Sequence, residues 1–335
     1  MTSSVDSCTE ARPRPVALCT LHSALGSLHP ALCTLHSALL AVLFAAVTFT
    51  ATASAQELEP RLMSNVPRGM NFAVLGYSYS RGNILMDPAI PVEGLDSKLH
   101  SFVAGYVRSV GLFRRTAKID AVLPFAAGDW NATLDGRDTT RVIDGFGDPR
   151  IRIFWNSFGS PALSGSQFRL FREGTVVGIG LQMTIPVGQY DNTKLINLGT
   201  NRWSFRPQLG VSRALGPWLI EGYASAWFFT KNPDFLEGNT LTQKPLVGGA
   251  IHLVRLFPGG FWIAADVAYG TGGRTAINDV SRDTRISSFR FGLTGAIPLA
   301  AQHSIKISLA SAARIERGPD FDIVIVSYQF RWGGG

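Results

Sequence analysis

The chain is poor in charge, and its mature part lacks cysteine. All three cysteines, Cys8, Cys19 and Cys33, lie within the first 55 residues. If that stretch is removed as a leader, no disulfide can stabilise the remainder. Only 16% of the residues are charged, against about 25% in an average soluble domain. This deficit argues against an ordinary soluble surface and favours a protein that exposes much of its side-chain surface to lipid.

Long apolar runs are also missing after residue 56. A membrane-spanning helix needs about 18 or more apolar residues in succession, so a helical membrane protein is excluded for this part. The longest apolar run, residues 38–49, is followed by Ala53-Ser-Ala55. This order predicts a secretory signal cleaved after Ala55, and we interpret residues 1–55 as a leader. The alternative, a membrane helix, is disfavoured because the run is too short to span.

A short duplication precedes the signal: residues 17–25 recur unchanged as residues 31–39. It places Cys19 before His22, and Cys33 before His36, at a spacing that zinc sites use. The duplication adjoins a signal peptide and would be lost on cleavage. We therefore expect no metal site and no cofactor in the mature protein.

The end of the chain indicates the fold class most directly. Residues 324–332 alternate between two kinds of side chain, as a strand with two different faces requires. One face holds Val324, Val326, Tyr328, Phe330 and Trp332, and the other holds Ile325, Ser327, Gln329 and Arg331. An apolar strand face tipped with aromatic residues is typical of an outer-membrane β-barrel.

The mature part contains twelve segments with this alternation, separated by turn residues. The segments are Met70–Ser80, Lys98–Arg108, Thr116–Phe125, Asp148–Trp155, Thr175–Pro186, Arg202–Arg213, Trp218–Thr230, Pro245–Phe257, Gly260–Gly270, Thr284–Pro298, Ser304–Ala313 and Phe321–Trp332. We predict an all-β fold, a transmembrane antiparallel β-barrel of about 12 strands over residues 70–332. Residues 56–69 precede it as a periplasmic N-terminal segment, and residues 333–335 follow it as a glycine tail. Barrels of ten or fourteen strands remain alternatives.

The connections support a barrel with its N-terminus in the periplasm. Inside links should be short and outside links long. The inside links 109–115, 214–217, 258–259 and 299–303 are short, whereas the outside links 81–97, 126–147, 187–201, 231–244 and 271–283 are longer and polar. The links 156–174 and 314–320 break the pattern. Pro124, Pro186 and Pro298 each predict a strand end or a bulge, because proline cannot donate to a ladder.

Alternation also assigns side chains to the lumen, since a charge facing lipid costs about 2–4 kcal/mol near the bilayer midplane. The candidates are Lys118, Asp120, Arg150, Arg152, Gln182, Arg202, Arg206, Gln208, Glu221, Asp266, Arg290, Lys306, Gln329 and Arg331. Basic side chains predominate among them. They predict either a positively biased pore or a lattice of ion pairs that fills the barrel. Trp227 and Phe229 are candidate apolar liners near the outer mouth.

Several motifs occur in order along the central part of the chain. They are Phe146-Gly-Asp-Pro149, then Ile185-Pro-Val-Gly-Gln-Tyr-Asp191, then Asn197-Leu-Gly-Thr-Asn-Arg-Trp-Ser-Phe-Arg-Pro207. With the terminal aromatic strand, they resemble the outer-membrane transporter family of the MetA-pathway of phenol degradation. The resemblance extends over most of residues 60–332. It implies a porin-like barrel associated with the breakdown of aromatic compounds. The glycine tail after Trp332 departs from barrels that end on the aromatic residue itself.

Three functions follow from these observations. We favour an outer-membrane channel for passive uptake of small hydrophobic or aromatic compounds. The alternative is a structural or adhesive barrel with a closed, charge-filled lumen. An enzyme is disfavoured because an activated serine needs a histidine partner, and His100 and Ser101 face opposite sides of a strand. The expected partners are outer-membrane lipids, the barrel-assembly machinery and a small solute. No nucleic acid is expected, because the basic residues are dispersed.

Overall fold

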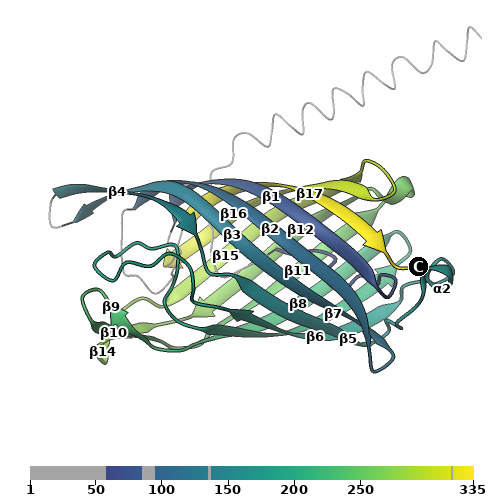
Figure 1. The fold of residues 1–335 in the computed structure, drawn as a ribbon, viewed down its shortest axis with the longest axis horizontal. Coiled ribbons are helices and arrows are strands. Elements are labelled where there is room, and N and C mark those ends of the chain that lie inside the picture. The colour runs from purple at the N-terminus through teal and green to yellow at the C-terminus, as the bar shows by residue number, and fades with distance from the viewer. Residues whose placement is uncertain (1–57, 85–94, 135–136, 318–319) are drawn as a thin grey trace, which may run out of the picture. The chain divides into compact units, whose positions relative to one another are not determined.

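Twelve antiparallel strands close into a barrel (Figure 1). The computed structural model describes residues 58–84, 95–134, 137–317 and 320–335. The leader, its duplication and the predicted cleavage site lie outside these residues. The wall strands are β1 (Met70–Asn83), β2 (Asp96–Leu112), β3 (Arg115–Leu134), β5 (Arg150–Phe158), β6 (Thr175–Thr184), β7 (Ser204–Leu215), β8 (Trp218–Phe229), β11 (Leu246–Leu256), β12 (Trp262–Gly272), β15 (Ile286–Pro298), β16 (His303–Arg317) and β17 (Asp320–Gly333). Each overlaps one predicted segment, so the predicted strand number and fold class are confirmed.

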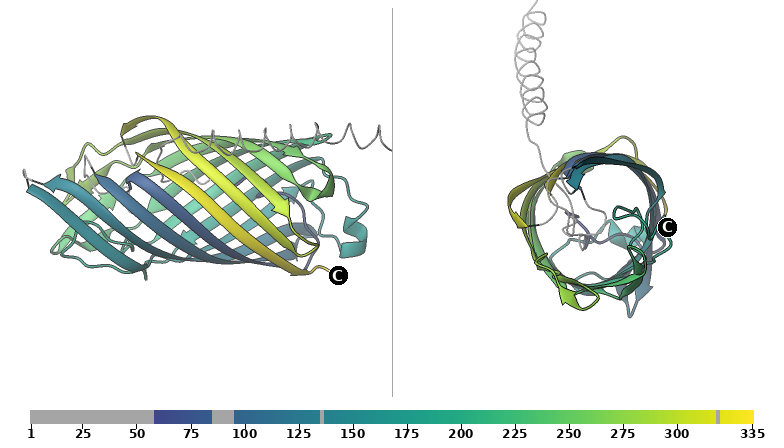
Figure 2. Two further views of the ribbon diagram at one scale, coloured as in Figure 1. Left: turned by 90° about the horizontal axis from the view of Figure 1, so that it is seen from above. Right: turned by 90° about the vertical axis from the view of Figure 1, so that its left-hand side faces the viewer.

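The last strand closes the barrel on the first. β17 pairs with β1 along its whole length, from Met70 opposite Gly333 to Asn83 opposite Asp320. Its alternation matches the predicted faces, since Val324 is 43% exposed and Ser327 only 8%. Viewed along its axis, the strands are arranged in a ring (Figure 2). Closure removes the free strand edges that an open sheet would present to other chains.

Short inside turns join the wall strands at one end of the barrel. β2 and β3 are joined by Phe113 and Arg114, which both have positive φ, as a two-residue type I′ hairpin turn requires. The 3-10 helix η1 (Pro258–Gly260) joins β11 to β12. The long link between β5 and β6 contains the short helix α2 (Gly165–Phe168). No helix in the described part of the chain is long and apolar enough to cross a membrane.

The outside links build structure that the alternation pattern did not predict. A small sheet forms at the opposite end from α2 (Figure 1), with strand order β14-β13-β10-β9. Its strands are β9 (Asn232–Phe235), β10 (Asn239–Gln243), β13 (Thr275–Ile277) and β14 (Val280–Ser281). Because β10 pairs with β13, the sheet joins the link after β8 to the link after β12.

The pairing between wall strands is interrupted beside the outer half of β3. The predicted outside link 126–147 is instead the outer part of β3 followed by β4 (Arg137–Phe146), which pairs with it. β3 pairs with β5 as far as Val122 and with β4 from Phe125 on. Strands β4 and β5 therefore lie along the same edge of β3, with residues 147–149 between them.

Pro124 marks this break, and the prediction that it ends or bulges a strand is wrong. It lies inside β3, where the pairing partner changes. Its carbonyl accepts the N–H of Gly147 at 3.0 Å. Since the N and O of one strand residue point to the same side, the missing N–H faces the interruption, where no ladder bond is lost. Pro298 ends β15, and Pro186 follows the end of β6, as predicted.

Asp148 connects the two sides of the break. Its carboxylate accepts the N–H of Gly188 at 2.8 Å, the N–H of Thr200 at 2.8 Å and the Thr200 hydroxyl at 2.7 Å. Gly188 also packs against Gly199 so closely that a Cβ on Gly199 would lie 2.7 Å from the Gly188 carbonyl carbon. The three sequence motifs between residues 146 and 207 thus meet at one point of the wall, where they replace a strand pairing.

We expect Asp148→Ala to destabilise the barrel by roughly 2–5 kcal/mol, because it removes three hydrogen bonds to a charged acceptor. Urea unfolding of the protein in lipid vesicles, followed by tryptophan fluorescence, measures the change. Asp144→Ala is the matched control, since Asp144 is an exposed carboxylate on β4. Equal unfolding midpoints for the two variants would show that Asp148 does not hold the wall together.

Candidate functional site

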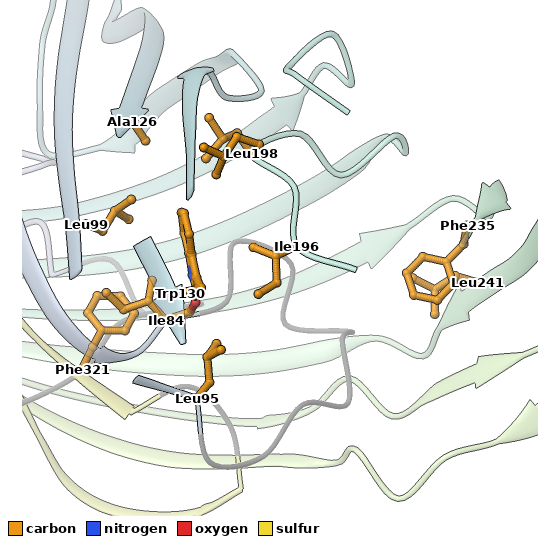
Figure 3. Close-up of a cluster of buried hydrophobic side chains, with 11 residues drawn as sticks. Ile84, Leu95, Leu99, Ala126, Trp130, Ile196, Leu198, Phe235, Leu241 and Phe321 are labelled. Atoms are coloured by element: carbon orange, nitrogen blue, oxygen red, sulfur yellow. Dashed lines mark hydrogen bonds between the residues drawn. The ribbon is translucent and has the colours of Figure 1, made fainter. Parts of the chain in front are cut away.

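Apolar side chains fill the outer end of the lumen (Figure 3). They come from the inner face of the wall and from the outside links, and each is buried. The outer apolar cluster consists of Ile84, Leu95, Leu99, Ala126, Trp130, Ile143, Ile196, Leu198, Phe235, Leu241 and Phe321. Such a patch inside a barrel offers a non-polar environment to a solute that enters from outside.

Trp130 of β3 is the largest side chain of the cluster, and it is only 1% exposed. Its indole Nε1 donates to the Ile84 carbonyl oxygen at 2.7 Å, which satisfies the buried donor. Alternation along β3 turns Trp130 and Ala126 inward, whereas Ile119 and Leu123 are exposed on the outer face. The cluster therefore belongs to the lumen and not to the lipid-facing surface.

Residues 58–66, here called the luminal segment, lie inside the other half of the barrel. They belong to the stretch 56–69 that the sequence predicts as a periplasmic N-terminal segment, and nothing in the sequence indicated that they enter the lumen. Lys118 Nζ of β3 donates to the carbonyls of Leu62 at 2.9 Å and Ser64 at 2.7 Å. Asn156 Nδ2 of β5 donates to the Met63 carbonyl at 2.8 Å. Inward polar side chains of the wall thus donate hydrogen bonds to backbone carbonyls that would otherwise be buried without partners.

Met63 anchors the luminal segment by packing. Its side chain is fully buried and contacts Phe154, Val176 and Tyr223. Gly210 of the wall lies opposite the Met63 side chain, and a Cβ on this glycine would lie 2.8 Å from the Met63 sulfur. The absence of a side chain at Gly210 therefore makes room for the thioether, and the segment and the wall fit together closely.

Charged groups hold the luminal segment at its N-terminal side. Arg152 forms an ion pair with Glu59 of the segment, and its Nε donates to Asp120 Oδ2 at 2.9 Å. The backbone N–H of Arg61 donates to Glu221 Oε2 at 2.5 Å. Burial alone would raise the pKa of Glu59, but the charge and hydrogen bond of Arg152 outweigh it and lower that pKa from 4.5 to about 2.

This lowered pKa predicts how pH affects the segment. The attraction of Arg152 for Glu59 is complete above the ordinary pKa of 4.5 and is lost as the pH falls toward about 2. Conductance in planar bilayers should be constant between about pH 7 and pH 5 and should rise below about pH 4. Glu59→Gln should remove most of the rise. A rise of the same size in this variant would assign the effect to other groups.

The three histidines among the described residues lie apart from one another. His252 Nδ1 of β11 lies 2.7 Å from Asp266 Oδ1 of β12, and both are buried in the lumen. Asp266 Oδ2 also accepts the Thr294 hydroxyl at 2.9 Å. His100 and His303 lie beside Tyr77 and Tyr328 on the outer face. Among the described residues, no group of three or more His, Cys, Asp or Glu side chains could hold a metal ion.

The fourteen predicted lumen residues fall into three regions. Ten of them lie on inward positions of the middle and inner wall: Lys118, Asp120, Arg150, Arg152, Gln182, Arg206, Gln208, Glu221, Asp266 and Lys306. Arg202 and Arg290 lie near the outer mouth, with their guanidinium groups over the rings of Phe229 at 4.6 Å and Phe321 at 5.7 Å. Gln329 and Arg331 lie near the inner rim, where Arg331 Nε donates to the Ala301 carbonyl at 2.9 Å. The structure brings Asp120 and Arg152 into direct contact, together with Glu59.

Sequence reasoning missed the luminal segment, His252 and the outer apolar cluster. The luminal segment has no periodic pattern, so nothing marked Glu59, Arg61 or Met63. His252 occupies an inward position by the same alternation that selected Glu221 and Asp266, so that signal was available. Trp227 and Phe229 face the lumen, and both lie under arginine side chains.

Residues 88–310 match the family described as "Putative MetA-pathway of phenol degradation". This span is more than half of the chain. The chain belongs to this family. No protein of curated function matches it.

The fold is similar to that of solved outer-membrane proteins. The COG4313 outer membrane channel from Pseudomonas putida F1 is 20% identical, with 82% of this chain and 100% of that chain covered, at a TM-score of 0.68. The β domain of the Bordetella autotransporter BrkA is 14% identical, with 79% and 100% covered, at a TM-score of 0.46. The CymD monoaromatic hydrocarbon channel is 7% identical, with 80% and 89% covered, at a TM-score of 0.39. The first likeness supports the fold, and the other two are too distant to support an argument.

Family membership and the closed barrel place this protein in the bacterial outer membrane. Its fold is that of an outer-membrane β-barrel. Its outward side chains face lipid, and its lumen is the surface available to a small solute.

Proposed function

We propose that this protein takes up small hydrophobic or aromatic compounds passively through the outer membrane. The outer apolar cluster is the observation that carries the proposal. It occupies the mouth of the lumen, where a porin for sugars or ions would present polar groups. The match to a family named for phenol degradation supports the same class of solute.

The size of the apolar contact is sufficient to select such a solute. An aromatic ring that buries about 150 Å² of apolar surface gains about 4 kcal/mol relative to water. A sugar gains little and loses hydrogen bonds to water. Leu99, Trp130 and Phe321 therefore form a first binding surface that favours rings over sugars. The solute enters by loosening side chains of the outside links, of which residues 187–201 form no strand.

The luminal segment controls the second half of the path. Its contacts with Lys118, Arg152 and Glu221 hold it against the inner face of the wall, in the path of a solute. Passive uptake then requires that part of this segment moves away from the wall. Ion pairs in a lumen that reaches water are weaker than the strand ladder, so they are the contacts that yield first.

A closed structural barrel is the second candidate function. The same ion pairs and the same luminal segment favour it, because they tie the segment to the wall inside the lumen. In that case the outer apolar cluster would serve only to pack the outside links together. The two functions differ in one property, the movement of solute.

Solute entry into vesicles with lipopolysaccharide in the outer leaflet separates these functions, since that leaflet slows the direct entry of apolar molecules. We expect vesicles with the protein to take up a fluorescent single-ring aromatic compound several times faster than protein-free vesicles, while a sugar of similar mass gains no comparable advantage. Correct folding is verified by the gel shift of the unheated barrel. Folded protein without accelerated aromatic uptake would support the closed barrel.

We further propose that the barrel-assembly machinery inserts this protein despite its glycine tail. β17 continues to Gly333, and Trp332 stays on the outer face as the terminal aromatic residue. Gly333 and Gly334 have φ values of 81° and 79°, so the tail turns away from the strand. The aromatic face of β17 therefore remains continuous up to the end of the ladder.

A further inference from the structure

The inner end of the lipid-facing surface carries two arginines close to the ends of their strands. Arg213 lies two residues before the end of β7, and Arg255 lies one residue before the end of β11. Both occupy outward positions, because the preceding residues, Ser212 and Val254, are buried on the luminal side. At a rise of about 3.4 Å per residue, both lie within about 7 Å of the strand ends, at the depth of lipid headgroups.

These two arginines are the only charged side chains over a large part of that surface. The outward positions of β5, β6, β7, β8, β11, β12 and β15, all of them described, hold no other Lys or Arg and no Asp or Glu. The turns at residues 216–217 and 257–261 hold none either. Glu173, in the link before β6, faces the lumen, since its Oε1 accepts the N–H of Asn65 at 2.9 Å. Two positive charges therefore stand without a carboxylate at the membrane interface.

Aromatic rings hold Arg255 in place. It lies opposite Trp218 of β8 in the strand register. Its guanidinium carbon lies 5.1 Å from the centre of the Trp218 ring and 5.5 Å from the centre of the Phe257 ring. Within the described part of the chain, no residue accepts a hydrogen bond from this guanidinium. Its planar set of N–H donors is thus positioned by stacking and is available to an acceptor outside the protein.

Arg213 lies on the other side of β8 from Arg255. Its Nη1 donates to Thr175 Oγ1 at 2.6 Å, which fixes the side chain and leaves its remaining N–H groups for another acceptor. Two strand spacings, roughly 10 Å, separate the backbones of the two arginines across the sheet, a span that two long side chains can close around one headgroup. Leu215 and Ile220 are exposed beside them and offer an apolar surface to lipid chains.

The ligand that fits this patch is an anion with apolar chains. Guanidinium groups bind phosphate oxygens with paired hydrogen bonds. A zwitterionic phospholipid adds a cation, which meets two arginines and no carboxylate, whereas an anionic phospholipid adds none. A free phosphate gains nothing from Leu215 and Ile220. Water can hydrate the two arginines, but it does not select one lipid over another.

We propose that Arg213, Arg255 and Trp218 form a binding site for an anionic phospholipid of the inner leaflet. The phosphodiester lies between the two guanidinium groups, and the acyl chains lie along Leu215 and Ile220. The site is on the outer face of the barrel, so it does not depend on the solute that passes through the lumen.

Lipid titration of the folded mature protein in detergent, with bound lipid counted by native mass spectrometry, tests the site. The probes are dioleoylphosphatidylglycerol and dioleoylphosphatidylcholine, which share their chains and their phosphodiester but differ in net charge. We expect the first phosphatidylglycerol to bind about tenfold more tightly than phosphatidylcholine, as attraction to two interfacial arginines provides. The double variant Arg213→Gln/Arg255→Gln should lose this preference. Equal affinities for the two lipids in the wild type would overturn the proposal.

Matched variants separate this site from the overall charge of the protein. Arg282→Gln removes the same charge from an exposed position at the outer end and should keep the wild-type preference. Arg255→Lys keeps the charge and should retain a preference for phosphatidylglycerol. A loss in Arg282→Gln equal to that in the double variant would refute the site, provided that the gel shift of the unheated barrel shows both proteins folded.

A competition experiment identifies the source of the phosphate. Glycerol 3-phosphate, added at the concentration of the lipid, should leave phosphatidylglycerol bound, because it lacks the acyl chains that contact Leu215 and Ile220. Displacement at equal concentration would show that the arginines take a soluble phosphate, and the lipid site would be refuted.

Discussion

Deleting residues 58–66 should turn the protein into a more conductive pore. The deletion removes the luminal segment and its contacts with Lys118, Arg152 and Glu221. The wall should remain folded, because its strands pair with one another and not with the segment. We expect single-channel conductance in planar bilayers to rise severalfold, since the conducting cross-section widens where Met63 and its neighbours now lie.

A point variant tests the same claim without shortening the chain. Arg152→Met breaks the ion pair with Glu59 while it keeps an unbranched side chain in the wall. Its channel should open more often than the wild type, with an intermediate conductance. Arg172→Ala serves as the control, because Arg172 is an exposed side chain of the link between β5 and β6. Unchanged conductance in a folded deletion protein would mean that the luminal segment does not close the pore.

Leu99→Asp should strongly reduce the uptake of aromatic compounds. Leu99 is buried in the outer apolar cluster beside Trp130 and Phe321. A carboxylate at this position keeps water in the mouth and costs several kcal/mol if it is buried unpaired. We expect aromatic uptake into lipopolysaccharide-containing vesicles to fall by about tenfold or more, which corresponds to 1.4 kcal/mol in solute affinity.

Leu99→Ile is the matched control, since it preserves volume and apolarity and should keep near wild-type uptake. Conductance of small ions through the Leu99→Asp protein should be unchanged or higher, because the new charge hydrates the mouth. An aspartate variant that is folded and takes up aromatic compounds at the wild-type rate would exclude the outer apolar cluster from the path.

The wall could be predicted from the sequence because its chemistry repeats every second residue. Lipid on one side and a polar lumen on the other impose the same alternation on every strand, so β17 and β7 were recognised with their faces. The same rule placed Asp120 and Arg152 inward, where they meet. The prediction that Pro124 ends or bulges a strand was wrong because a strand can change its pairing partner halfway. A proline in the sequence shows only that one backbone N–H is absent, and at Pro124 that N–H would have faced the interruption.

The contents of the lumen could not be predicted in the same way. The outer apolar cluster joins Ile84, Ile196 and Phe235, which lie in different outside links and follow no common period. The luminal segment binds through backbone carbonyls of Leu62 and Ser64, which any residue would supply. Contacts of this kind depend on the closed wall, because only the wall brings these stretches together.

Photolabelling tests the central claim most directly, namely that an aromatic solute occupies the lumen. A single-ring aromatic probe with a diazirine group is bound to the folded protein, and the labelled residues are mapped by mass spectrometry with and without excess p-cresol. We predict that p-cresol displaces labels from peptides containing Leu99, Trp130 or Trp227, whereas labels on lipid-facing residues such as Leu75 and Ile251 persist. Displaceable labelling confined to the outer face, with none in the lumen, would contradict the account.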